Sequence, residues 1–402
     1  MNVVQKYGGT CLDTLEKVKA VAQYIASIKK EDDNMVVVAS AMGSSTKELV
    51  DMAKKMGKTI PKRELEALLS TGEQRTVALL AIALQNLGVD AVSMTDFQSG
   101  FVDTEHTVAA NVKEINTEST EKFLSEGKIV VMAGFQGIGE NYTVDALGRG
   151  GSDTTAVAIA AQFDWPCEIY TDTVDAMYTA DPKVYSKARK LDAITYEEMM
   201  ELSSLGNEIL ETRSIELAKK YSVDLFIGKA LETDKRKGTK IMNETILVED
   251  MPITGITMSD NCTIYSMRNM ENDGVAVADL FCLLAESNIN VDMISKQIDG
   301  NGKCTVSFSC TEEQAKDLDA AIASNQKLGR IEIGKQRNLS ILSLVGVGMA
   351  TCAGVASKVF SILAKEGIPY YQITTSEITI SVTVDQDKKM KAVIALCESF
   401  GL

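Results

Sequence analysis

Apolar runs and amphipathic stretches alternate along the first half of the chain. Short stretches that read as strands, most of them with two or more Val or Ile, lie at residues 3–7, 35–39, 89–95, 128–134 and 167–172. Between them, apolar residues recur at three- and four-residue spacing, as they do from Leu15 to Ile28. Strands that alternate with helices in this way are typical of a parallel sheet covered on both faces. We therefore expect an α/β fold, with a mostly parallel sheet and helices on both faces, over residues 1–228.

Local signals predict where three of these helices begin. Asp13 with Glu16 fits a capping box ahead of the first helix. The stretch STGEQ is expected to open the helix TVALLAIALQNLG, so that Glu73 stands in a first turn. The stretch GRGGSD is expected to open a helix that runs to Phe163.

The second half of the chain nearly repeats itself. Residues 274–295 (GVAVADLFCLLAESNINVDMIS) resemble residues 354–376 (GVASKVFSILAKEGIPYYQITTS), and each copy continues into an alternating strand and a charged helix. Two modules of β-α-β-β-α-β type follow from this repeat. The second copy ends at Leu402 without its last strand, whereas the strand PITGITM is left over before the first copy. We expect the first module to be inserted in the second.

The expected boundaries follow from this arrangement. The polar, charged stretch 229–250 is expected to be a linker. The first module would take residues 260–335, and the second residues 252–259 plus 336–402.

Composition and charge exclude several classes of function. The net charge is −15 over 402 residues, which makes nucleic acid an improbable partner. His106 is the single histidine, which argues against a zinc site built on histidines and against a Ser-His-Asp triad. Eight cysteines lie scattered without CxxC pairs, and no apolar run reaches the length of a membrane span or forms a leader. We expect a cytoplasmic protein with reduced thiols and no membrane partner.

Three glycine-containing loops carry the candidate chemistry. KYGGT (6–10), SAMGSST (40–46) and GRGGSD (148–153) each follow a predicted strand and precede a predicted helix. Backbone N–H groups at a helix N-terminus favour an anion. Plain turns are the alternative, because glycine is common in any turn. Three such loops on one sheet, two of them with Lys6 or Arg149, favour a phosphorylated ligand beside a carboxylate, although none is a P-loop.

Seven motifs in this order resemble the aspartate kinases of the amino acid kinase superfamily: KYGGT, SAMGSST, LLSTGEQ, MAGFQG, LGRGGSDTTA, CEIYTD and YTADP. The tandem modules resemble the ACT domains of that family, which have a ferredoxin-like fold. The resemblance implies transfer of a phosphoryl group from ATP to L-aspartate, the first step of lysine, threonine and methionine biosynthesis. It also implies Mg²⁺ carried by the nucleotide rather than by a metal site of the protein, a homo-oligomer (dimer or tetramer) formed through the ACT domains, and feedback by lysine, threonine or both.

The resemblance also implies roles for individual residues. Lys6 would stabilise the transferring phosphoryl group, and Asp153 would hold Lys6 by an ion pair or cap its helix. Arg149 and Ser152 would read the substrate, and Arg149 can take a carboxylate with two parallel N–H bonds. Glu73 would pair with the α-ammonium, or merely favour the helix dipole. Hydroxyls for the aspartate would come from Ser40 and Thr46, and nucleotide contacts from Lys6, Gly8, Gly9, Thr171, Asp172, Tyr178 and Lys183.

Two places depart from the family pattern. The segment TDTVDAMYTADP (171–182) has one residue more than the family's TDVDGVYTADP, and Ala176 replaces its glycine. Ala176 would be strained if that glycine used a positive φ, unless the extra residue re-routes the loop. Glu208 stands where the family has a lysine near the nucleotide. The alternatives are a weak paralogue that senses amino acids for a partner, or another superfamily kinase acting on acetylglutamate, glutamate or uridylate.

The first ACT module offers a candidate effector site. The predicted turn from its first strand to its first helix holds Asp273 and Gly274, where the dipole can take an α-carboxylate and Asp273 an ammonium. Asn290, Asp292 and Gln297 would close over the ligand. The alternative is that Asp273 only caps its helix.

Overall fold

The computed structural model describes residues 2–104, 111–138, 144–148, 150–207, 209–243, 251–324 and 331–402. The chain is divided between two units. The first unit holds residues 1–178, 190–203 and 208–247, and the second holds residues 179–189, 204–207 and 248–402. No helix in the described ranges is long and apolar enough to cross a membrane.

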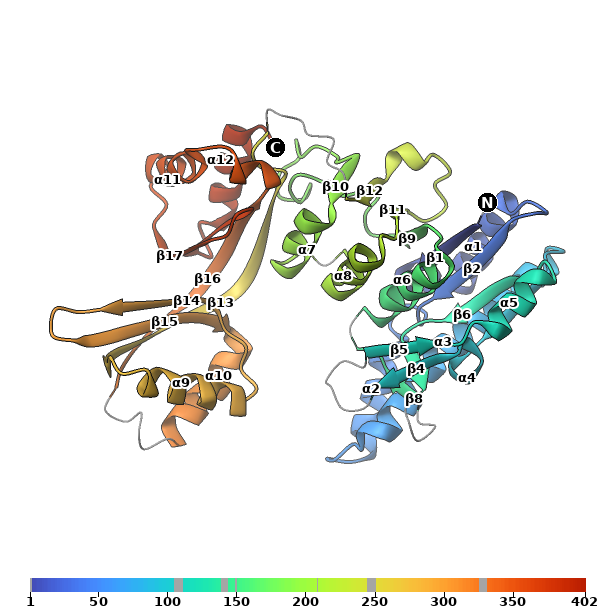
Figure 1. Cartoon of the computed structure of the whole chain (residues 1–402), viewed down its shortest axis with the longest axis horizontal. Helices are drawn as coiled ribbons and strands as arrows, with labels where there is room; N and C mark the ends of the chain where they lie inside the picture. Colours follow the sequence, from blue (N-terminus) through green and yellow to red (C-terminus); the bar gives the residue numbers. More distant parts are fainter. Residues whose placement is uncertain are drawn as a thin grey trace. The chain divides into compact units, whose positions relative to one another are not determined.

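The main sheet of the first unit is mostly parallel, as the sequence predicts (Figure 1). Strand pairs from β9 to β3 are parallel, whereas β11 and β12 pair antiparallel at the other side. In spatial order the strands are β10 (Ala193–Thr195), β12 (Thr239–Met242), β11 (Leu225–Lys229), β9 (Cys167–Thr171), β1 (Asn2–Tyr7), β2 (Asn34–Ala39), β6 (Ile129–Ala133) and β3 (Ala91–Met94).

Helices cover both faces of this sheet. Val3 and Tyr7 point into an apolar cluster with α1 (Leu15–Ile28) and α3 (Lys62–Asn86). The other face carries α6 (Gly151–Phe163), which packs on β1, β2 and β9 and against α8 (Thr212–Tyr221). Because side chains alternate along a strand, Lys6 faces α6 rather than α1 and α3. Further helices are α2 (Ser45–Met56), α4 (Asp96–Ser99), α5 (Glu118–Ser125) and α7 (Tyr196–Ser204).

Three local expectations are wrong. The cap of α1 is Thr14, whose hydroxyl accepts a hydrogen bond from the backbone N–H of Lys17, and not Asp13. Glu73 lies deep inside α3, because that helix begins at Lys62 and runs unbroken through STGEQ. The stretch expected as a linker contributes β12, which pairs antiparallel with β11. In this short strand the buried residues Thr239 and Ile241 alternate with less buried ones.

A small second sheet also belongs to the first unit. Its strands are β5 (Asn111–Ile115), β4 (Phe101–Thr104), β7 (Gln136–Ile138) and β8 (Val144–Ala146). These strands are short, and no repeat or apolar run in the sequence predicts them.

The second unit is built on one antiparallel sheet with the strand order β14-β15-β13-β16-β18-β17. Its helices form two apolar clusters with this sheet, one for each predicted module. The elements are β13 (Gly255–Glu271), α9 (Val275–Glu286), β14 (Asp292–Ile298), β15 (Lys303–Thr311), α10 (Glu312–Ser324), β16 (Glu332–Val345), α11 (Val355–Lys365), β17 (Tyr370–Thr375), β18 (Thr379–Asp385) and α12 (Lys389–Phe400).

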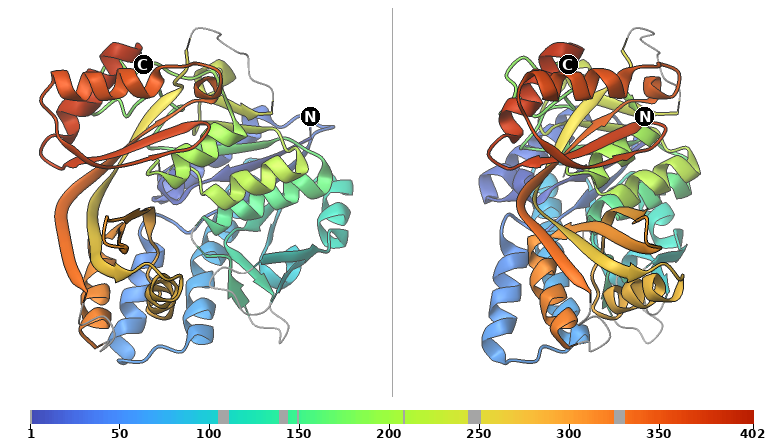
Figure 2. Two further views of the ribbon diagram at one scale, coloured as in Figure 1. Left: turned by 60° about the vertical axis from the view of Figure 1, so that its left-hand side comes forward. Right: turned by 90° about the vertical axis from the view of Figure 1, so that its left-hand side faces the viewer.

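Two long strands run through both modules (Figure 2). The first part of β13, residues 255–259, pairs with residues 341–345 of β16, beside β18. Its later part, residues 262–271, pairs with β15. The strand left over before the first repeat therefore lies in the sheet of the second repeat.

Residues 179–189 are a detached piece of the second unit. Ala180 and Tyr185 are buried in the apolar cluster that also holds Ile253 and residues of β16, α11 and α12. The backbone N–H of Ile256 donates to the carbonyl of Thr179 at 2.8 Å. The chain thus leaves the first unit after Tyr178 and returns to it at Lys190.

Candidate functional site

The glycine loops meet at one edge of the main sheet. Because β1, β2, β6 and β9 are parallel, their carboxyl ends lie side by side. Backbone hydrogen bonds join the loops that follow: Gly8 donates to Tyr170 at 3.2 Å, Ser40 to Tyr7 at 3.2 Å, and Gly43 to Gly9 at 3.0 Å. The loops after β1, β2 and β9 therefore form one connected surface of backbone rather than separate turns. The expectation that all three glycine loops follow strands of one sheet is wrong, because Ser152 and Asp153 follow β8 of the small sheet and reach this edge at the start of α6, which packs on β1 and β2.

Two glycines in these loops are required by close approach. A Cβ on Gly9 would lie 2.6 Å from the carbonyl oxygen of Ala41. A Cβ on Gly134, in the loop after β6, would lie 2.6 Å from the hydroxyl of Ser152 at the start of α6. Any larger residue would separate the loops.

Lys6 and Asp153 form the ion pair that the sequence predicts. Lys6 Nζ lies 2.6 Å from Asp153 Oδ1, and the two side chains are only 13% and 9% exposed. Asp153 lies in the first turn of α6, whose cap position is taken by Gly150 at φ 67°. The capping alternative for Asp153 is therefore wrong, since a glycine with left-handed backbone begins the helix. The Lys6 ammonium, which is largely shielded from solvent, therefore lies beside Gly8 and Gly9.

Glu73 is a buried carboxylate beside the second loop. It is 4% exposed, and Oε1 accepts a hydrogen bond from the backbone N–H of Ala41 at 3.1 Å. Oε2 has no hydrogen-bond partner among the residues that the structure describes. Burial raises the pKa of Glu73 to about 7. A half-satisfied buried carboxylate suits a cationic group that arrives with a ligand.

The other residues predicted to bind the substrate differ in how exposed they are. Ser152 is buried beside Gly134, and Ser40 is half-buried at the end of β2. Thr46 is exposed, whereas its neighbour Ser45 is buried and donates to the carbonyl of Met42. Arg149 lies outside the described residues.

The predicted nucleotide segment folds back on itself at the end of β9. Thr171 Oγ1 accepts from the backbone N–H of Thr173 at 3.2 Å, and the Tyr178 hydroxyl donates to Asp175 at 3.1 Å. Ala176 is buried and does not take a positive φ, so the expected strain is absent. Lys183 belongs to the second unit. Glu208 lies outside the described residues.

Lys17 is a charged residue at this edge that sequence reasoning missed. Its ammonium contacts Asp172 Oδ2 at 2.7 Å, Asp13 Oδ2 at 3.0 Å and the carbonyl of Thr10 at 2.9 Å. The hydrogen bonds to Asp172 and Asp13 raise the pKa of Lys17. The spacing of Asp13 and Lys17 by four residues was a visible signal for part of this contact.

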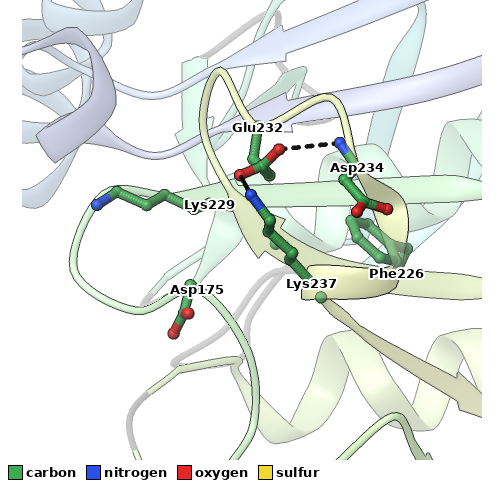
Figure 3. A pocket seen from close by; sticks show the side chains of 8 residues that line it. Asp175, Phe226, Lys229, Glu232, Asp234 and Lys237 are labelled. Carbon is green, nitrogen blue, oxygen red and sulfur yellow. Dashed lines mark hydrogen bonds and ion pairs between the residues drawn. The ribbon is translucent and has the colours of Figure 1, made fainter. Parts of the chain in front are cut away.

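A cavity of about 240 Å³ opens beside the nucleotide segment (Figure 3). It lies between Asp175 and the connection from β11 to β12. Lys237 Nζ is 2.7 Å from Glu232 Oε2 in this connection, and Glu232 Oε1 accepts from the backbone N–H of Asp234 at 3.0 Å. The sequence did not predict this cavity, because most of its lining comes from the stretch expected to be a linker.

The predicted effector residues are exposed in the second unit: Asp273, Gly274, Asn290, Asp292 and Gln297. Asp273 Oδ1 accepts a hydrogen bond from the backbone N–H of Ala276 at 2.9 Å, so this carboxylate caps α9. Its second oxygen remains for other contacts, and the capping and binding alternatives are compatible.

Known families match both parts of the chain. Residues 1–229 match the amino acid kinase family, and residues 342–400 match an ACT domain. The aspartokinase of Bacillus sp. (strain MGA3) is 40% identical over 402 residues, which are 100% of this chain and 97% of that protein. Aspartokinase 2 of Bacillus subtilis (strain 168) is 39% identical over 402 residues, 100% of this chain and 98% of that protein.

Solved structures show the same architecture. Escherichia coli aspartokinase III, in complex with aspartate and ADP, superposes with a TM-score of 0.79 at 20% identity, covering 100% of both chains, and supports the fold alone. The aspartate kinase of Synechocystis is 33% identical with a TM-score of 0.56, covering 100% of this chain and 69% of that one.

Proposed function

The chain belongs to the aspartokinases of the amino acid kinase family, and from this premise we propose that it transfers the γ-phosphoryl group of ATP to the side-chain carboxylate of L-aspartate. The products are ADP and 4-phospho-L-aspartate. The observation that carries the proposal is the sheltered Lys6–Asp153 pair beside two joined glycine loops, with the buried Glu73 next to the second loop.

Charge is the main obstacle to this reaction. The acceptor carboxylate is already ionised at neutral pH, so no general base is needed, but it must approach a polyphosphate of the same sign. Catalysis then rests on positioning and on neutralising charge in the transition state. Lys6 supplies a positive charge beside Gly8 and Gly9, and Asp153 fixes the direction of its ammonium.

The substrate's other groups have matching partners. Glu73 takes the α-ammonium with Oε2, for which the described part of the chain offers no hydrogen-bond partner, and the ammonium draws this carboxyl into its ionised form. Arg149, Ser152, Ser40 and Thr46 are proposed for the carboxylates of aspartate.

The nucleotide is proposed to lie over Gly8, Gly9, Thr171, Asp172 and Tyr178, with Lys183 as a further contact. Mg²⁺ is proposed to come with its phosphates, where it would neutralise charge on the transferring group. The two carboxylates at this edge, Asp153 and Asp172, are ion-paired with Lys6 and Lys17, so no residue of the chain is assigned to Mg²⁺.

Regulation and assembly are part of the same proposal. The ACT modules are proposed to bind lysine, threonine or both, and to hold the chain in a dimer or tetramer. A complex of Escherichia coli aspartokinase III with lysine and aspartate, which shares this fold, supports only the lysine part of the proposal. A cytoplasmic location, where ATP is available, is proposed as well.

The test is formation of aspartyl hydroxamate from L-aspartate, Mg-ATP and hydroxylamine. Lys6→Ala should lower kcat by roughly 10²- to 10³-fold while KM for aspartate changes little, because Lys6 acts on developing charge. Lys19→Ala, an exposed lysine of α1, is the matched control and should retain wild-type rates. A wild-type chain that forms no hydroxamate would instead support a regulatory paralogue, and an active Lys6→Ala enzyme would refute the role of Lys6.

A further inference from the structure

The ammonium of Lys17 joins two loops that are far apart in sequence. It contacts the carbonyl of Thr10 and the carboxylate of Asp13, which border the turn after β1. It also contacts Asp172, the first residue after β9, at 2.7 Å. One side chain of α1 therefore connects the glycine turn with the start of the nucleotide segment.

These two loops already lie next to each other through their strands. β1 and β9 are parallel neighbours, with Tyr7 opposite Tyr170. The carbonyl of Tyr170 accepts from the backbone N–H of Gly8 at 3.2 Å and from the thiol of Cys11 at 3.5 Å. The contacts between β1 and β9 end at Tyr170. On its other side β9 stays paired with β11 as far as Thr171, whose carbonyl accepts from the backbone N–H of Ala230 at 3.0 Å. Lys17 therefore supplies the side-chain link between the glycine turn and Asp172.

The charge of Asp172 makes its position important. A carboxylate beside a turn that receives a polyphosphate repels it unless a cation intervenes. Lys17 balances that charge and also holds the carboxylate at a fixed distance from the carbonyl of Thr10.

We propose that Lys17 is a positioning residue for the nucleotide: it fixes the spacing between the glycine turn and Asp172 and neutralises Asp172 there. The inference rests on the proposed kinase function. The competing explanation is an ordinary surface ion pair, which contributes little to stability when both partners are solvated. Lys17 and Asp172 are 39% and 36% exposed, so removal of the pair should scarcely affect folding.

The first variant is Lys17→Met, which keeps the aliphatic stem and removes the charge. Titration calorimetry with Mg-ADP should show affinity reduced roughly tenfold, the loss expected for hydrogen bonds to charged groups. KM for ATP should rise in parallel, whereas KM for aspartate and the melting temperature stay at wild-type values. Lys19→Met, on the same helix, is the control and should bind Mg-ADP as the wild type does.

Two further variants keep the inference testable. Lys17→Arg retains the charge and should restore most of the affinity for Mg-ADP. Asp13→Asn keeps Lys17 but weakens one of its three contacts, so it should reduce the affinity in the same direction by a smaller factor, even if Lys17→Met does not fold.

The outcomes separate this inference from the proposed function. A wild-type chain that makes aspartyl hydroxamate, together with Lys17→Met and Asp13→Asn proteins that bind Mg-ADP as tightly as wild type, would overturn the role of Lys17 alone. Tighter binding by Lys17→Met would overturn it too, since Lys17 would then hinder nucleotide binding rather than assist it. A wild-type chain without hydroxamate activity and without Mg-ADP binding would overturn both.

Discussion

Glu73 shows how one residue serves the substrate at the expense of stability. Its carboxyl is buried and accepts a hydrogen bond from the backbone N–H of Ala41, and burial raises its pKa to about 7. An unfolded glutamate has a pKa near 4.3. The folded chain therefore holds this proton more tightly than the unfolded chain does, and perturbed groups of this kind concentrate at functional sites.

The sign of the pH dependence follows from that difference. The contribution of Glu73 to stability is fully present below about pH 4.3 and is lost as pH rises through about 7. Glu73→Gln keeps an acceptor for Ala41 and cannot ionise. We expect it to raise the free energy of unfolding by roughly 3 kcal/mol at pH 8 and by much less at pH 5, as measured by urea denaturation.

The same variant should lose its pH-dependent affinity for aspartate. In the wild type, KM for aspartate should fall as pH rises from 6 to 8, because the ionised carboxylate pairs with the α-ammonium. In Glu73→Gln, KM should be high and flat over this range. Equal pH profiles for the two proteins would show that another group binds the ammonium.

At the scale of elements, Gly9 and the loop after β2 depend on each other. The carbonyl of Gly9 accepts from Gly43, and a Cβ on Gly9 would lie 2.6 Å from the carbonyl oxygen of Ala41. Gly9→Ala therefore has to push backbone away from backbone.

We expect Gly9→Ala to destabilise the chain by roughly 1–3 kcal/mol, the usual cost of overpacking, and to lower hydroxamate formation at least tenfold. Gly88→Ala is a control for glycine replacement at a positive φ, since a Cβ there meets nothing within 4 Å. That control should lose stability and keep activity. Retained activity in Gly9→Ala would show that the loop can move without harm to the site.

The elements that the sequence predicted well have one physical property in common. The strands β2 and β6 are buried on both faces, so they are nearly continuous runs of apolar residues. The mostly buried strands β1 and β9 hold the apolar pairs Val3–Val4 and Ile169–Tyr170. The strand β12 was not predicted, because only alternate residues of this short hairpin strand are buried. A helix was expected to begin at STGEQ, but this stretch lies inside α3. Its glycine, Gly72, allows close packing on Ala41 and does not mark the start of a helix.

The same distinction applies to the site. The Lys6–Asp153 pair was predicted because both residues lie in recognisable motifs, and the structure places their charged atoms 2.6 Å apart. The Lys17–Asp172 contact joins two residues outside any shared motif, so only the fold brings them together. Roles for Arg149 and Glu208 stay predictions.

At the scale of the whole molecule, regulation by an amino acid requires that an effector bind one conformation better than another. The Asp273 carboxylate caps α9 by accepting from the backbone N–H of Ala276. Replacing Asp273 by alanine would remove this cap and any ligand contact together, so the two effects could not be separated. Asn is as good a cap as Asp but carries no charge. Asp273→Asn should therefore keep the wild-type melting temperature and relieve inhibition by lysine or threonine.

Inhibition would be measured as hydroxamate formation against effector concentration, at saturating ATP and subsaturating aspartate. Uninhibited kcat should match the wild type in Asp273→Asn. If calorimetry detects neither lysine nor threonine binding to the wild-type chain, alone or together, the first module has no effector role.

The detached segment 179–189 also has a consequence for folding during synthesis. On the ribosome it emerges well ahead of Ile253, β16, α11 and α12, the partners that bury Ala180 and Tyr185. A nascent chain can close its parallel sheet early, yet Ala180 and Tyr185 stay unburied until synthesis reaches the last helix. Truncated or stalled translation products would therefore expose Tyr185, and such chains would be bound by chaperones or degraded by proteases.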